Sequence, residues 1–190
     1  MLFGISPQPT LGSAVVRVLA ANVLSYMHEI YNGTRPYPFP TPIIPGVSCV
    51  ARVVATGPDA TKIQPGDLVF VDCTVRSRDD PTHVYLAAIH EGFTPGSAKL
   101  MKDVFKDWCY AEYCRTPLEN LTVFDEKRLT SSPNDGGLGY RIEQLAFVSP
   151  LLVPYGGLRD IELKAGQTVV VAPATGPFGG AAVLVVRTDG

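Results

Sequence analysis

Near its carboxyl end the chain carries a glycine-rich turn whose residue types and spacing suit the binding of a phosphate. The apolar run at 168–171 just before it predicts a buried strand, and the small residues after it predict the start of a helix. Glycines in such a turn let a phosphate approach the backbone amides, as in dinucleotide-binding proteins. We therefore expect dinucleotide binding by Ala174, Thr175, Gly176, Pro177, Phe178 and Gly179.

Each residue of the turn has a physical reason for its type. Gly176 allows a tight turn, Gly179 lets the helix pack closely on the strand, and Pro177 suits a first helical turn, where no amide hydrogen is needed. The alternative is a structural strand-to-helix turn without a ligand. A complete dinucleotide domain needs further parallel strands, and the chain stops at Gly190. We therefore expect an incomplete form that alone binds dinucleotide weakly or not at all.

A second group of reactive side chains follows the first predicted strand. Within residues 22–28, Ser25, Tyr26 and His28 are the groups that can donate or relay a proton. The simpler alternative is that they cap or pack a turn before a short helix. The spacing of the histidines and cysteines matches no metal signature. We therefore expect no metal site among His28, His83, His90, Cys73 and Cys109.

Composition narrows the class of protein. The net charge is −2 without a basic run, which argues against nucleic-acid binding. No apolar run approaches the roughly 20 residues of a membrane helix, and the amino terminus lacks the pattern of a secretory signal. The four cysteines show no disulfide spacing, which favours a reduced, cytoplasmic location. The expected partner is therefore a small-molecule substrate, with no nucleic acid and no membrane.

The elements that must position these residues are short. The 18 glycines and 17 prolines favour many short strands over long helices. We expect strands at 14–20, 48–56, 68–72 and 110–115, with an extended proline-rich loop at 34–45 and an irregular stretch at 73–97. Cys109 and Cys114 are expected to face opposite ways near the last of these strands. Ser97 is predicted to cap a helix over 98–108, and Pro150 to end or kink a short helix over 141–149.

The order of these motifs resembles the medium-chain dehydrogenase/reductase superfamily. The matching stretches are 16–20, Pro45-Gly46, 55–58, 62–69, 110–113, and 165–171 with the glycine turn. The resemblance implies a mainly β GroES-like barrel with short helices, followed by the first β-α unit of a Rossmann domain. The corresponding domains are residues 1–150, the catalytic domain, and 151–190, the incomplete start of the NAD(P)-binding domain.

The departures from that superfamily concern zinc. Where zinc-dependent members have Gly-His-Glu, this chain has Gly46, Val47 and Ser48, and segment 22–28 lacks their cysteine. Valine and leucine offer no zinc ligand. The chain therefore resembles the zinc-independent branch, which includes quinone oxidoreductases and enoyl reductases. By this resemblance, segment 22–28 lines the nicotinamide pocket, and Val47 and Ser48 line the substrate pocket.

The resemblance implies an NAD(P)H-dependent oxidoreductase that transfers hydride to a carbonyl or an activated C=C bond, without zinc. NADPH is the expected cofactor, and a homodimer is the expected assembly. We expect this chain to have little activity alone. The alternative is a non-catalytic GroES-like module that binds a partner, because the barrel is shared with co-chaperonins.

Overall fold

The computed structural model describes residues 7–164 and 166–188 of a chain that divides into two compact units. Unit 1 is Met1–Ala146 and unit 2 is Phe147–Gly190. The division falls a few residues before the expected domain boundary, which follows Pro150. Within the described ranges, no helix is both long and apolar enough to cross a membrane.

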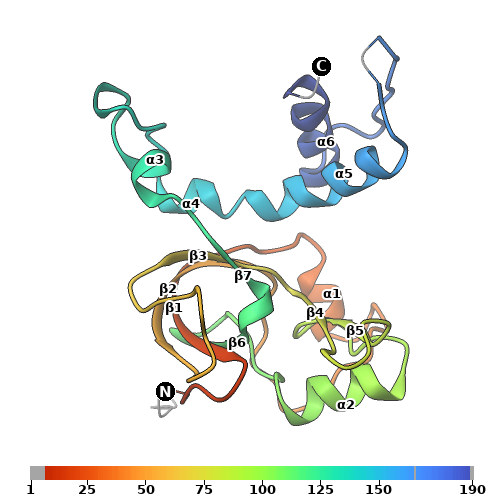
Figure 1. Cartoon of the computed structure of the whole chain (residues 1–190). Helices are drawn as coiled ribbons and strands as arrows, with labels where there is room; N and C mark the ends of the chain where they lie inside the picture. Colours follow the sequence, from red (N-terminus) through yellow and green to blue (C-terminus); the bar gives the residue numbers. More distant parts are fainter. Residues whose placement is uncertain (1–6, 165, 189–190) are drawn as a thin grey trace. The chain divides into compact units, whose positions relative to one another are not determined.

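Unit 1 is built on a five-stranded antiparallel sheet that curves around a buried core (Figure 1). In spatial order its strands are β6 (Tyr113–Pro117), β1 (Ser13–Ala21), β2 (Cys49–Thr56), β3 (Leu68–Val71) and β7 (Leu121–Val123). The predictions of strands at 14–20, 48–56 and 68–72 are confirmed, but the strand predicted at 110–115 begins only at Tyr113. Short helices accompany the sheet: α1 (Met27–Tyr31), α3 (Glu126–Thr130), α4 (Ile142–Leu145), and the 3-10 turns η1 (Leu118–Asn120) and η2 (Pro133–Asp135).

Strand β2 shows how side-chain alternation sorts residues between two faces. Cys49, Ala51 and Val53 lie in the main core of the unit. Val50 lies in a second cluster, with Leu145 of α4. Both faces of this part of the sheet are thus covered, one by the main core and the other by α4.

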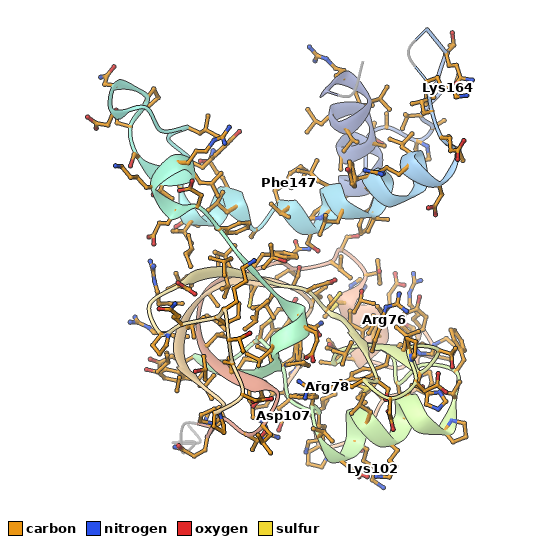
Figure 2. All side chains as sticks on the ribbon, in the orientation of Figure 1. Arg76, Arg78, Lys102, Asp107, Phe147 and Lys164 are labelled. Atoms are coloured by element: carbon orange, nitrogen blue, oxygen red, sulfur yellow. The ribbon has the colours of Figure 1, made fainter. Side chains whose placement is uncertain are left out.

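The stretch at 73–97 was expected to be irregular, and this prediction was wrong. It contains a two-stranded sheet of β4 (Thr74–Arg76) and β5 (Val84–Leu86). These strands are too short to give a clear period-2 pattern, although Val75 and Tyr85 are both buried. In the connection between them, Arg78 Nη2 donates to the carbonyl of Gly12 at 2.8 Å, which ties the small sheet to the start of β1 (Figure 2).

The helix predicted over 98–108 begins and ends earlier, as α2 (Pro95–Asp103). Its N-cap is Thr94, not Ser97, because Thr94 Oγ1 accepts the Ser97 N–H at 3.1 Å. Pro95 then takes the first helical position, where proline is favoured. Trp108 is therefore outside the helix.

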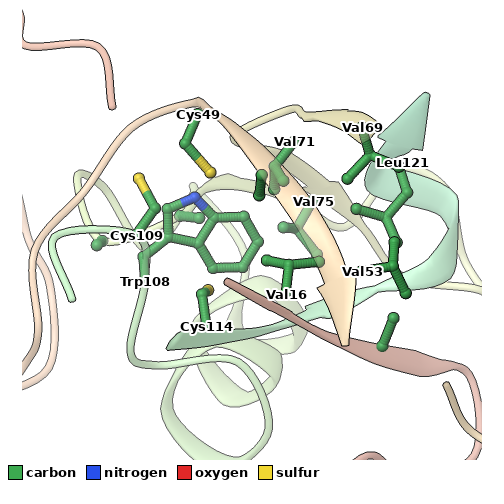
Figure 3. Packing of buried hydrophobic residues seen from close by; sticks show 14 of the residues in the cluster. Val16, Cys49, Val53, Val69, Val71, Val75, Trp108, Cys109, Cys114 and Leu121 are labelled. Carbon is green, nitrogen blue, oxygen red and sulfur yellow. The ribbon is translucent and has the colours of Figure 1, made fainter. Parts of the chain in front are cut away.

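Trp108 lies at the centre of the main core, among three buried cysteines (Figure 3). Its Nε1–H donates to the carbonyl of Val47 at 2.5 Å. Cys109 precedes β6, whereas Cys114 is on it, and both belong to the same buried cluster with Cys49. The expectation that Cys109 and Cys114 face opposite ways was wrong, because the chain between them is not one continuous strand.

Unit 2 consists of α5 (Val148–Asp160), an irregular segment, and α6 (Pro177–Thr188), with the two helices in contact. Pro150 does not end a helix over 141–149: α4 ends at Leu145, and Pro150 lies in the first turn of α5, where its missing N–H costs no helical hydrogen bond. The strand predicted at 168–171 is not formed. Among the described residues it has no strand partner, and Val170 is 85% exposed.

Candidate active site

The segment that follows β1 and the loop that precedes β2 meet in one apolar cluster of unit 1. The buried members of this cluster, which we call the floor cluster, are Met27, Ile30, Val47 and Ile89. Met27 and Ile30 are the two buried residues of α1, and Leu24 packs against the same cluster. The fold therefore brings segment 22–28 and Val47 together, as expected for two parts of one site.

The three proton-donating groups of that segment have different surroundings. Ser25 is exposed in a turn, and His28 is exposed on α1. Tyr26 is half-buried at the N-cap of α1 and packs against the floor cluster. Burial raises the pKa of the Tyr26 phenol, so it stays protonated at neutral pH. Of the three, only Tyr26 packs against the floor cluster, and the catalytic roles of all three stay predictions.

An aromatic strip continues from Tyr26 to the surface. The Arg35 guanidinium lies 4.5 Å from the Tyr26 ring centre and 5.7 Å from that of Tyr37. Tyr37 contacts His90 at 5.2 Å between ring centres, and His90 contacts Phe93 at 4.8 Å. Phe93 is 92% exposed. The sequence interpretation missed these residues, because the strip joins a proline-rich loop to the end of β5 and no local pattern links them.

The loop before β2 is held tightly against the chain around Trp108. Gly46 has a φ of +155°, and a Cβ there would lie 2.5 Å from the backbone nitrogen of Cys109. The Tyr110 N–H donates to the carbonyl of Pro45 at 2.9 Å. Only glycine allows this close approach, which explains the Pro45-Gly46 motif and fixes the position of Val47.

Two polar side-chain atoms near this loop are buried without a hydrogen-bond partner in the part of the chain that the structure describes. They are the amide nitrogen Nδ2 of Asn22 and the hydroxyl Oγ of Ser48. The sequence interpretation named Ser48 for the substrate pocket but assigned no role to Asn22. Which residues of β1 and β2 lie opposite each other depends on strand register, and the sequence alone did not define that register.

The residues at this place do not fit a zinc ion. Val47, at the position where zinc-dependent members have histidine, is buried among apolar side chains, and Leu24 packs against them. Zinc requires thiolate, imidazole or carboxylate ligands. Within residues 7–164 and 166–188, no three histidine, cysteine or acidic side chains are grouped so as to hold a metal.

The histidines outside this segment have structural partners. His83 Nδ1 lies 3.0 Å from Thr94 Oγ1, the N-cap of α2. His90 Nδ1 accepts the Gly92 N–H at 3.0 Å. Cys73 packs against the floor cluster, and burial raises the pKa of its thiol to about 12. A protonated thiol is a poor metal ligand and a poor nucleophile, so Cys73 contributes an apolar surface at neutral pH.

In unit 2, the glycine turn leads into the amino end of α6, which begins at Pro177 as expected. A Cβ on Gly179 would collide with the carbonyl oxygen of Pro173, so the helix packs against the preceding chain only with glycine there. A Cβ on Gly176 would meet no atom within 4 Å, which leaves the backbone open to a ligand. Ala174 and Thr175 are exposed beside it. These residues fit a pyrophosphate at a helix amino terminus.

Residues 10–126, more than half of the chain, match the family described as the alcohol dehydrogenase GroES-like domain. The chain belongs to this family. The match confirms the expected fold class, a mainly β GroES-like domain with short helices. No curated protein sequence matches the chain.

Solved structures show the same fold at low sequence identity. Alcohol dehydrogenase TADH from Thermus sp. ATN1 is 23% identical, with a TM-score of 0.73 over 98% of this chain and 51% of that chain. A cobalt- and zinc-bound thermostable alcohol dehydrogenase from Pyrobaculum aerophilum is 21% identical, with a TM-score of 0.71 over 98% and 52%. An NAD-dependent alcohol dehydrogenase is 20% identical, with a TM-score of 0.70 over 98% and 50%. The chain thus spans about half the length of the structures that it matches.

Proposed function

We propose that the protein is an NAD(P)H-dependent oxidoreductase that works without zinc and reduces a carbonyl or an activated C=C bond, as quinone and enoyl reductases do. The observation that carries the proposal is the floor cluster. Val47 occupies the position at which zinc-dependent members have a histidine ligand, and it makes that position of the GroES-like domain apolar. A reduced nicotinamide, when bound, supplies the hydride, so this chain's residues need only bind, orient and protonate.

The residues divide this work between the two units. Ala174 to Gly179 would hold the pyrophosphate at the start of α6. In unit 1 the floor cluster would offer an apolar surface to the substrate, and the half-buried phenol of Tyr26, which packs against that cluster, would return a proton. The aromatic strip beside Tyr26 favours flat, unsaturated substrates, because aromatic rings stack with about 0.5–1.5 kcal/mol beyond their buried area.

Chelator resistance tests the metal-free part of the proposal. We expect the protein at its natural length to oxidise NADPH with 1,4-naphthoquinone or cyclohex-2-enone as acceptor, followed by absorbance at 340 nm. The rate should be unchanged after dialysis against 1,10-phenanthroline. A rate that falls with the chelator and returns with zinc would overturn the assignment to zinc-independent chemistry.

Two neighbouring glycines provide a matched test of the nucleotide turn. Gly179→Ala should weaken NADPH binding at least about tenfold, because the added Cβ collides with the Pro173 carbonyl and displaces the start of α6. Gly180→Ala is the control, since its Cβ would meet its nearest neighbour at an ordinary 3.7 Å. Isothermal titration measures both. Equal affinities in the two variants would remove the turn from the site.

The 190-residue chain itself should bind NADPH more weakly than the micromolar range. The segment at 168–171, which precedes the turn, has no strand partner within the described residues, so the turn lacks a rigid support. Micromolar binding by this chain would contradict that expectation without contradicting the turn as a binding site.

A further inference from the structure

The backbone places Asn22 and Ser48 directly opposite each other. In the β1–β2 ladder Ala20 pairs with Val50 and Ala21 with Cys49, and the Asn22 N–H extends it by donating to the Ser48 carbonyl at 2.9 Å. Opposed residues of an antiparallel pair project their side chains from the same face, with Cβ atoms about 5 Å apart. The Asn22 amide and the Ser48 hydroxyl are therefore neighbours.

Both side chains carry an unsatisfied donor. Ser48 is 1% exposed, and neither its Oγ nor Asn22 Nδ2 has a hydrogen-bond partner among the described residues. Ser13 shows the usual arrangement at equal burial: its Oγ donates to the Thr10 carbonyl at 2.9 Å and accepts the Thr10 N–H at 2.8 Å. A buried donor without a partner costs about 1–3 kcal/mol, so two adjacent ones need an explanation.

Their surroundings make any hydrogen bond to them strong. Ala20 lies two residues before Asn22, and Val50 lies two residues after Ser48, so each is on the same face as its neighbour. Both belong to the apolar cluster beneath α4. Solvent reaches neither donor atom, so a ligand must displace a covering side chain to enter. Once inside, it would be bound in apolar surroundings, where each hydrogen bond is stronger than in water.

We propose that the Asn22 amide and the Ser48 hydroxyl form a two-donor subsite that binds the carbonyl oxygen of the substrate. This inference rests on the proposed function and names the groups that would hold that oxygen. The Asn22 amide donates and the Ser48 hydroxyl can donate, and a carbonyl oxygen has two lone pairs that accept from both groups. Negative charge that develops on the oxygen during reduction would be stabilised by the same two donors.

Stability is the first test, because an orphaned hydroxyl and a satisfied one predict opposite signs. Ser48→Ala removes an unsatisfied group and should raise the Tm of unit 1 by about 2–4 °C. The matched control, Ser13→Ala, removes a hydroxyl that is hydrogen-bonded to Thr10 and should lower the Tm. The single tryptophan, Trp108, lies in the core of unit 1, so its fluorescence reports the transition of that unit. If Ser48→Ala lowers the Tm as Ser13→Ala does, the hydroxyl already has a partner such as ordered water, and the proposal fails.

Ligand binding is the second test. In the unsubstituted protein, cyclohex-2-enone should shift the side-chain ¹⁵NH₂ signals of Asn22, while cyclohexene, which lacks the oxygen, should not. Ser48→Ala and Asn22→Leu should each weaken enone binding about five- to tenfold, the value of one hydrogen bond. Absence of enone binding, or equal binding by wild type and both variants, would overturn the subsite. Enone binding at this pair without NADPH oxidation would instead leave the subsite standing and refute the proposed function.

Discussion

The two units of the chain bury their apolar residues to very different degrees. In unit 1, Trp108 and Val69 are at most 1% exposed within one large cluster. In unit 2, Ile161 is 67% and Val170 85% exposed, although the sequence around Val170 is as apolar as any strand of unit 1. An apolar run therefore becomes a strand only where the chain also supplies neighbours to pair with it and cover it.

This contrast matters for function, because each unit carries its own candidate binding residues. The floor cluster and the Asn22–Ser48 pair are held by the β1–β2 ladder and by the packing around Trp108. The glycine turn leads into α6, which approaches Pro173 closely and contacts α5, but the segment before the turn has no strand partner among the described residues. We therefore expect substrate-side chemistry to be preorganised in unit 1, and the nucleotide side to be the less rigid of the two.

The largest expected effect comes from removing the centre of the unit 1 core. Trp108→Ala should lower the free energy of unfolding of that unit by about 3–5 kcal/mol, because it leaves a cavity and an unpaired Val47 carbonyl. Val170 is an exposed apolar residue of unit 2, and Val170→Ala should change the free energy of unfolding of unit 2 by less than about 0.5 kcal/mol. Urea unfolding followed by circular dichroism gives both values. Similar losses in the two variants would remove the contrast between the units.

Thiol reactivity tests one side of the comparison, the tight burial in unit 1, since all four cysteines lie in that unit. The pKa of Cys73 is raised from 9.0 to about 12 by burial, so at pH 8 its alkylation by iodoacetamide should be about 1000-fold slower than that of an ordinary thiol. The raised pKa also means that this thiol favours the folded state below pH 9 and ceases to do so as the pH rises toward 12.

Mass spectrometry of the Cys73 peptide measures that rate, and the same reaction in urea is the control, in which all four cysteines should react. Alkylation of Cys73 in the folded protein at the rate of an exposed thiol would show that the floor cluster is open to solvent.

Local patterns predicted the elements that are defined by local physics. The strand predicted at 48–56 matches β2, and the strand predicted at 68–72 matches β3. The start of α2 was misplaced because Thr94 and Ser97 are both good caps, and only the observed hydrogen bond distinguishes them. Trp108 was placed at the end of the helix predicted over 98–108, because a buried aromatic residue has the same signature in a loop as in a helix.

The sequence predicted some residues of the candidate site and missed others. Segment 22–28 and Val47 were named from their order along the chain, and the fold brings them together in the floor cluster. The partnership of Asn22 with Ser48 was not predictable, since a shift of one residue in strand register would have placed the two side chains on different faces. The aromatic strip was missed for a related reason: its members come from loops whose approach depends on backbone contacts such as that of Glu91 N–H with the Pro38 carbonyl at 2.7 Å.

The smallest expected effect concerns an ion pair that joins β2 to α3. Arg52 Nη1 and Nη2 contact the Glu126 carboxylate at 2.5 and 2.8 Å, but the two side chains are 34% and 42% exposed. Solvent screening limits such a pair, so Glu126→Gln should cost about 0.5 kcal/mol at pH 7. Arg52 holds the pKa of Glu126 below 4.5, so the contribution is present above that pH and is lost as the pH falls further.

Urea unfolding of both proteins at pH 7 and pH 3 tests this assignment. The difference between wild type and Glu126→Gln should be measurable at pH 7 and smaller at pH 3, because the wild-type carboxylate gains protons as the pH falls. Glu143→Gln is the matched control, because its pair with Arg141 is long, at 3.9 Å, and more than 70% exposed on both sides. It should leave stability unchanged at either pH. A loss at pH 3 equal to that at pH 7 would mean that Glu126 acts through packing against β2, and that charge contributes nothing to holding α3 on the sheet.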